Sequence, residues 1–158
     1  MYTHLDDTRK NNHFPRIHML YRLIYYSTAK PSLGYQQLKQ ILLSAEKNNQ
    51  VNDITGVLLY SDGRFLQILE GTRENLTHTF LRISQDFRHH DAVLVDFVEI
   101  SERDFPEWTM KLIKWPEHKP ASYMGPKFEK FRPQHWTGLE THTAIIELVK
   151  KQKRAVTT

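Results

Sequence analysis

Short apolar runs alternate along the chain with longer segments in which apolar residues recur at helical spacing. The runs are rich in aliphatic, aromatic and β-branched residues, which is typical of buried strands. Strands are predicted at 19–27, in the two halves of 54–71, at 92–100 and at 108–113. The two halves of 54–71 are separated by Asp62-Gly63, which favours a two-residue hairpin turn because glycine accepts positive φ.

Three amphipathic helices are predicted between and after these strands. Their apolar residues fall on one helical face. The segments are 33–49 with Leu38, Ile41, Leu42 and Ala45; 72–87 with Leu76, Phe80, Ile83 and Phe87; and 139–153 with Leu139, Ile145, Ile146, Leu148 and Val149. Thr72 is expected to cap the second helix, and Asn48-Asn49 is expected to end the first.

The order of these elements predicts an α+β fold. A β-α-β-β-α-β order with right-handed crossovers gives a ferredoxin-like sandwich with two helices on one face, here with an added fifth strand. Residues 114–138 combine prolines with aromatic residues and are expected to be irregular or to hold short helices. Together with the last helix they are free to form a C-terminal helical cap on the other face. The expected divisions are a flexible arm at 1–18, a domain at 19–113, and a cap with a basic tail at 114–158.

Composition narrows the function classes. The absence of cysteine excludes disulfides, thiol nucleophiles and thiolate zinc sites. No apolar run reaches the roughly 18 residues of a membrane span, and the first residues lack the apolar core of a signal peptide, so a cytoplasmic protein without a membrane partner is expected. Residues 1–110 carry 12 Lys/Arg and 14 Asp/Glu, whereas residues 111–158 carry 10 and 4. The basicity therefore belongs to the tail, which disfavours nucleic-acid binding by the folded body and leaves DNA or an anionic surface open for the tail.

Several catalytic signatures are missing from the sequence. It holds no glycine-rich phosphate loop, no Gly-x-Ser-x-Gly, no His-Glu-x-x-His and no glycine-aromatic motif of an RNA-recognition strand. His89-His90-Asp91, close to Asp86, has the residue types of a metal site. Adjacent histidines in a strand or loop point apart, however, so no metal is expected.

One polar residue stands out inside an apolar strand. Gln67 follows Phe65 and Leu66, and its amide has two donor hydrogens and an acceptor oxygen that need partners. In the predicted topology its strand neighbours the first strand, so Tyr25 and Gln67 can lie side by side. A phenol can give one electron and one proton to an excited aromatic acceptor, and an amide can then reorient.

Other polar residues are expected near the same place, at the ends of the first two helices. They are Asn48, Asn49, Arg82, Asp86, Arg88 and His89. Each has an ordinary structural explanation, as a helix end, a surface charge or a core aromatic in the case of Tyr25. Together they offer donors and acceptors to a planar heterocycle with imide-like edges.

Five segments of the chain together resemble the BLUF family, blue-light sensors using FAD. They are LYRLIYYS at 20–27, NNQVNDITGVLLY at 48–60, FLQILEG at 65–71, RISQDFRHH at 82–90 and FPEWTMKL at 105–112. The resemblance covers about residues 19–113 and implies a non-covalently bound FAD. Tyr26 is a local departure, since small residues are common there in relatives.

The resemblance also implies roles for individual residues. Tyr25 matches the electron and proton donor, and Gln67 matches the glutamine beside flavin N5 whose hydrogen bonds rearrange after excitation. Trp108 and Met110 match a signal-relay pair on the fifth strand. The flavin-binding residues it implies are Ile24 packing on the ring, Asn49 at the carbonyl edge with Asn48 beside it, and Asp86, Arg88, His89 and Arg82.

The implied function is a blue-light photoreceptor rather than an enzyme. About 45 residues follow the match, too few for a cyclase or phosphodiesterase domain, so we expect signalling through the fifth strand and the cap to a partner protein, with self-association into a homo-oligomer. The sequence leaves open whether Trp108 or Met110 lies nearer the flavin, and whether FAD or FMN is preferred. Two rival classes are a ferredoxin-like RNA-binding module without flavin and a small acyl-phosphate hydrolase of the same fold.

Overall fold

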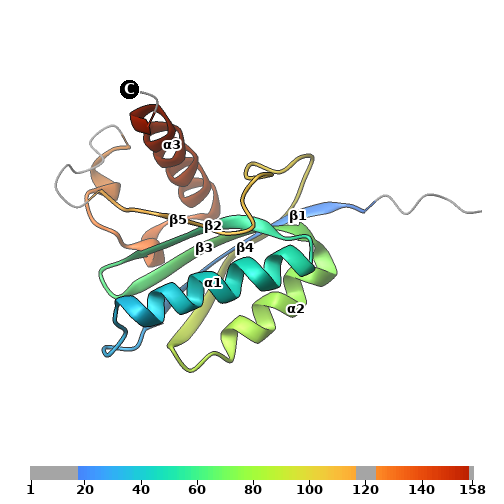
Figure 1. The fold of residues 1–158 in the computed structure, drawn as a ribbon. Coiled ribbons are helices and arrows are strands. Elements are labelled where there is room, and N and C mark those ends of the chain that lie inside the picture. Colours follow the sequence, from blue (N-terminus) through green and yellow to red (C-terminus); the bar gives the residue numbers. More distant parts are fainter. Residues whose placement is uncertain (1–17, 117–123, 157–158) are drawn as a thin grey trace, which may run out of the picture.

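The computed structural model describes residues 18–116 and 124–156 of the chain. Its elements follow the predicted order (Figure 1). They are β1 Leu20–Ala29, α1 Tyr35–Val51, β2 Thr55–Ser61, β3 Arg64–Thr72, α2 Arg73–Ser84, β4 His89–Ile100, β5 Lys111–Ile113 and α3 Gly138–Val156, with short 3-10 helices at Pro126–Phe128 and Pro133–His135. The α+β prediction is confirmed. The predicted arm lies outside the described residues except for His18, as does Tyr123 of the cap.

The five strands form one sheet in the order β4-β1-β3-β2-β5. All neighbouring strands pair antiparallel except β2 and β5, which pair parallel. At the β2–β3 turn, Asp62 has φ 50° and Gly63 has φ 70°, the two positive φ values that a type I′ hairpin turn requires. The predicted hairpin is therefore confirmed, and it fixes the register of β3 in the middle of the sheet.

The sheet is covered on both faces. Helices α1 and α2 lie on one side and α3 with the preceding segment on the other (Figure 1). Because side chains alternate along a strand, neighbours in β1 enter different cores: Tyr25 joins the α1/α2 side and Ile24 the α3 side. The α3-side core also contains Trp115, Trp136 and Ile145. The expectation that the C-terminal part covers the second face is confirmed.

Helix α2 ends earlier than predicted. It stops at Ser84, and the backbone N–H of Asp86 donates to the Ile83 carbonyl at 3.0 Å in a turn. Phe87, predicted on the helix's apolar face, is 74% exposed, with the Lys30 ammonium 5.1 Å from its ring centre. The turn brings the chain into β4 at residue 89, three residues before the predicted start.

Strand β5 is shorter than predicted because a turn replaces its first half. The backbone N–H of Trp108 donates to the Phe105 carbonyl at 3.2 Å, and regular pairing with β2 begins at Lys111. Trp108 and Met110 therefore precede β5. Leu139 also differs from prediction, since it is 74% exposed at the start of α3.

Helix α1 continues two residues beyond its predicted end. Asn52 is its C-cap, and its N–H donates to the carbonyls of Asn48 and Asn49, each at 3.2 Å. Thr72 caps α2 as predicted, its hydroxyl accepting from the Asn75 N–H at 3.3 Å. Within the described ranges, no helix is long and apolar enough to cross a bilayer.

Candidate functional site

A cleft opens between α1 and α2 above the middle strands of the sheet. It holds about 570 Å³ of space between side chains, part of it open to solvent. Its lining residues are Tyr25, Ile41, Ser44, Ala45, Asn49, Leu58, Phe65, Gln67, Thr79, Arg82, Ile83, Asp86, Arg88 and His89.

The floor of the cleft contains a chain of three hydrogen-bonded side chains. Strand pairing sets Tyr25 opposite Gln67. The Tyr25 hydroxyl donates to Gln67 Oε1, and Gln67 Nε2 donates to the sulfur of Met110 at 3.5 Å. Thioether sulfur is a weak acceptor, so the second bond is the weaker of the two. These two bonds hold Gln67 in one orientation at the cleft.

Tyr25 is a neutral phenol in this environment. Its side chain is buried, and burial raises its pKa well above the ordinary value, with a smaller contribution from the negative charge of Asp86. Its ring packs against Phe80 of α2 at 5.3 Å between centres. Tyr25 therefore keeps its proton at neutral pH and can act as a hydrogen-bond donor.

Asn49 connects the cleft to the segment before β5. It lies in the last turn of α1 and is 2% exposed. Its Nδ2 donates to the backbone carbonyl of Thr109 at 2.7 Å, one residue before Met110. Asn49 also lines the cleft, so its side-chain amide lies where a ligand could bind.

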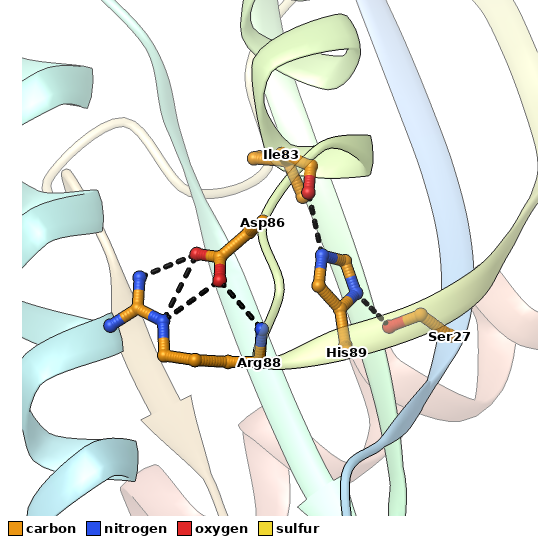
Figure 2. A network of polar contacts seen from close by, with 5 residues as sticks. All are labelled: Ser27, Ile83, Asp86, Arg88 and His89. Atoms are coloured by element: carbon orange, nitrogen blue, oxygen red, sulfur yellow. Dashed lines mark hydrogen bonds and ion pairs between the residues drawn. The ribbon is translucent and has the colours of Figure 1, made fainter.

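The far end of the cleft is formed by the turn between α2 and β4 (Figure 2). The Asp86 carboxylate accepts from the backbone N–H and from the guanidinium of Arg88, both at 2.9 Å to Oδ1. The hydrogen bond from the Arg88 side chain is the main cause that lowers the pKa of Asp86, and the same bond raises the pKa of Arg88. Both groups are therefore charged at neutral pH.

His89 is held on both sides of its ring (Figure 2). Its Nδ1 lies 2.7 Å from the Ser27 hydroxyl and its Nε2 lies 2.6 Å from the Ile83 carbonyl. Because a carbonyl only accepts, Nε2 carries a hydrogen. His90 turns instead toward Asp91, so the two histidines do not converge on one point.

Seven of the predicted residues line the cleft: Tyr25, Asn49, Gln67, Arg82, Asp86, Arg88 and His89. Asp86, expected in the last turn of the second helix, lies in the turn after α2 together with Arg88, and His89 begins β4. Met110 does not line the cleft but contacts Gln67.

Three predicted residues lie elsewhere. Ile24 is fully buried in the α3-side core, because it alternates with Tyr25 along β1, and its predicted place on a flavin ring is corrected. Asn48 is not among the lining residues. Trp108 stacks on Phe105 with ring centres 6.0 Å apart, on the α3 side, so Met110 is the member of the predicted pair that lies next to Gln67.

Small residues that shape the cleft were missed from the sequence. Ser44 and Ala45 on α1 and Thr79 on α2 line it. Thr79 is 2% exposed although it interrupts the apolar spacing between Leu76 and Ile83. A small or polar residue inside an otherwise apolar helical face is the signal that could have indicated a space at this position.

The donors and acceptors around the cleft fit a planar heterocycle. Apolar side chains form most of its walls, and the amides and charged groups are confined to its floor and ends, which is the composition expected of a cofactor site. The rival RNA-binding module would need exposed aromatic residues on the sheet face opposite α1 and α2. That face is buried under α3, with Leu66 and Ile68 fully buried, so this alternative does not fit.

Comparisons with known proteins match the part of the chain that contains the cleft. The BLUF family model, described as sensors of blue-light using FAD, matches residues 20–111. The chain is 40% identical over 89 residues to the photoactivated adenylate cyclase subunit beta of Euglena longa, covering 56% of this chain and 10% of that protein. It is 30% identical over 114 residues to the blue light- and temperature-regulated antirepressor BluF of Escherichia coli (strain K12), covering 71% and 28%. The chain thus spans about a tenth of the cyclase subunit.

Solved structures show the same fold. BlsA in its photo-activated state superposes with a TM-score of 0.75 at 30% identity, covering 82% of this chain and 94% of that chain. BlrB, a BLUF protein in its dark state, superposes with a TM-score of 0.70 at 27% identity, covering 85% and 97%. Since the family match spans more than half of the chain and includes every residue of the cleft, the chain belongs to the BLUF family, the sensors of blue light using FAD.

Proposed function

We propose that this chain is a blue-light photoreceptor in which light changes the hydrogen bonds of Gln67. The observation that carries the proposal is the buried chain from the Tyr25 hydroxyl through the Gln67 amide to the Met110 sulfur. Of these three side chains, Gln67 alone both donates and accepts a hydrogen bond within the group. Rotating its amide by about 180° would therefore alter both contacts at once.

The cleft residues have the chemistry to hold a flavin. Asn49 and Gln67 present amide groups that can pair with the carbonyl and N–H edges of the ring, and Arg82, exposed at the cleft, supplies a cation for the phosphates of FAD. Arg88 is kept in place by Asp86 and adds a second cation at the same end. When bound, the flavin supplies absorption of blue light and an excited ring that accepts an electron.

Tyr25 is the proposed donor. Its phenol is neutral and already directs its hydrogen toward Gln67. It gives up one electron and one proton after excitation and takes both back, so the protein and cofactor end in their starting oxidation states and nothing is turned over. Gln67 then remains in a different hydrogen-bonding arrangement, which is the signalling difference.

The proposed output runs through Met110 and the segment that leads to β5. This segment contacts Gln67 at Met110 and α1 at Thr109, and it packs on α3 through Phe105 and Trp108. We propose that the photosensory domain at 19–113 signals through the cap at 114–158 to a partner protein, and that the chain acts as a homo-oligomer. The excess of basic residues in 111–158 keeps an anionic surface among the partners to test.

An absorption spectrum tests this function. The purified protein is expected to carry oxidised flavin, identified as FAD or FMN after release by denaturation. Its long-wavelength band should shift to the red under blue light and recover in darkness. A protein that binds no flavin, or whose flavin band stays in place under blue light, is not the photoreceptor proposed.

A further inference from the structure

A buried carboxylate lies on the face of the sheet opposite the cleft. Glu70 is in β3, three residues after Gln67, and shares its face with Leu66 and Ile68. Its side chain has no exposed surface. Within residues 18–116 and 124–156, no lysine or arginine nitrogen pairs with its carboxylate.

Uncharged donors surround this carboxylate instead. Oε1 accepts from the backbone N–H of Asp104 at 2.8 Å. Oε2 accepts from the backbone N–H of Phe105 at 3.0 Å and from the Thr55 hydroxyl at 3.2 Å. Burial is the largest influence on the Glu70 pKa and raises it, while these three hydrogen bonds act in the opposite direction.

The buried position is unfavourable for a charge and would suit an aliphatic side chain. An apolar residue could fill the space, but it would leave the N–H groups of Asp104 and Phe105 without their acceptor. What Glu70 provides is a defined place for these two N–H groups relative to β3. The feature thus fixes position rather than adding apolar contact.

Arg103 strengthens the same attachment. Its guanidinium donates to the Thr55 hydroxyl and to the Glu70 carbonyl, both at 2.9 Å, and to the Asp53 carbonyl at 2.8 Å. Residues 103–105 are therefore tied to β2, β3 and the turn before β2. These contacts, centred on Glu70, form what we term the Glu70 anchor.

The anchored segment continues directly to the cleft. Five residues after Phe105 the chain reaches Met110, which contacts Gln67. Between them, the Trp108 carbonyl accepts from the Gly56 N–H at 2.8 Å and the Thr109 carbonyl from Asn49. The segment is thus held by Glu70 at one end and by cleft residues at the other.

The anchor also faces α3. The Asp104 carboxylate lies 2.7 Å from Nε2 of His142, and Phe105 is part of the core that α3 buries. One strand, β3, thereby contacts both ends of the segment, through Gln67 on the cleft face and Glu70 on the α3 face.

We propose that Glu70 is a positioning residue of the light switch: by fixing residues 103–105, it makes a change at Met110 act on α3 instead of being absorbed by movement of the segment. This inference rests on the proposed photoreceptor function. It assigns the coupling to a residue that does not line the cleft and whose carboxylate accepts its hydrogen bonds from Thr55, Asp104 and Phe105.

The test compares Glu70→Gln with wild type, both loaded with flavin. Glutamine keeps the volume of glutamate but turns an NH₂ group toward one of the backbone N–H donors, so one acceptor is lost. The readout is hydrogen–deuterium exchange of α3 peptides in darkness and under blue light. The light-dependent difference should fall about fivefold or more, because losing one buried acceptor changes an equilibrium by at least that factor. Flavin content and the red shift should be retained, since Tyr25 and Gln67 are unchanged.

Glu99→Gln is the matched control, because it makes the same chemical change at an exposed position of β4. It should keep the wild-type difference in α3. A Glu70→Gln protein with a full light-dependent difference overturns the inference, and so does a wild-type protein whose flavin band shifts while α3 does not respond. A wild-type protein whose flavin band does not shift overturns the proposed function itself.

Arg103→Lys decides the question if Glu70→Gln does not fold. Lysine keeps the charge but has a single nitrogen in place of the two guanidinium nitrogens that hold these oxygens. A smaller light-dependent difference in α3, with the red shift intact, supports the anchor. An unchanged difference contradicts it.

Discussion

Each face of β3 carries a buried polar side chain, and the two side chains differ in how firmly hydrogen bonds hold them. On the cleft face, Gln67 has a hydrogen bond from Tyr25 and a weak contact to the Met110 sulfur. On the α3 face, Glu70 accepts three hydrogen bonds between 2.8 and 3.2 Å. An amide with one weak partner can change orientation at small cost, whereas a carboxylate with three partners cannot. The fold thus sets an adjustable group and a fixed one three residues apart.

The largest effect is expected from removing the hydroxyl of Tyr25. Tyr25→Phe should bind flavin but show no red shift under blue light, because the ring has lost the group that gives the proton and that bonds Gln67. Absorption spectra before and after illumination measure this. Tyr60→Phe, which removes a hydroxyl on neighbouring β2 outside the cleft lining, should keep the full shift. If Tyr25→Phe still shifts, the donor is a different residue.

The second effect concerns stability, where the two faces should differ most clearly. Leu66→Ala creates a cavity in the fully buried α3-side core and should lower the free energy of unfolding by about 2–5 kcal/mol. Ile41→Ala changes a half-buried wall of an existing cleft and should cost only about 1 kcal/mol. Urea unfolding of the flavin-free proteins measures both. Equal losses would show that the cleft face is packed as tightly as the other.

The sequence predicts the fold better than the ends of its elements. Hydrophobic spacing places every strand and helix, since each must bury one face. It fails at Phe87 and at Trp108, where a backbone turn interrupts an apolar pattern that would have continued the element. Turns formed by local hydrogen bonds, such as that of Asp86 with the Arg88 N–H, leave little trace in hydrophobic periodicity.

For the site, the sequence identifies the polar groups but not their directions. Gln67 stands out because an amide interrupts an apolar strand, whereas Glu70 interrupts the same strand in the same way and is not among the predicted site residues. The resemblance implies that Ile24 packs on the flavin ring, but strand alternation with Tyr25 puts Ile24 on the opposite face of the sheet. The three donors to the Glu70 carboxylate come from residues 15, 34 and 35 positions away, which spacing alone cannot reveal.

A third, smaller effect is a difference in how stability depends on pH between Asp86, the carboxylate at the cleft, and Glu70, the carboxylate on the α3 face. The pKa of Asp86 lies below its ordinary value of 3.8 in the folded protein, so its contribution to stability is present above that value and is lost as the pH falls through the folded pKa. The pKa of Glu70 lies above its ordinary value of 4.5, so its contribution is present below that value and is lost as the pH rises through the folded pKa.

Unfolding curves between about pH 3 and pH 7 measure these slopes. The stability difference between wild type and Asp86→Asn should grow as the pH rises, and that between wild type and Glu70→Gln should shrink. The test is how each stability difference changes with pH and not its absolute size, because each substitution also changes hydrogen bonds at every pH. Two slopes of the same sign would contradict the contrast between the faces.

The smallest effect on stability is expected at the contact between Asp104 and α3. His142→Ala removes a partly exposed hydrogen bond that contributes at most about 1 kcal/mol to stability. The higher helix propensity of alanine offsets part of this loss. The free energy of unfolding should therefore change by less than about 0.5 kcal/mol, as it should for His78→Ala, an exposed histidine on α2. The light-dependent exchange difference in α3 should fall only in part, because Glu70 still holds residues 104 and 105 against the sheet and Ile145 and Leu148 still bury α3 on the core. A stability loss as large as that of Leu66→Ala would mean that α3 is docked through this single bond. His142, and not Glu70, would then be the residue that holds the α3 face in place.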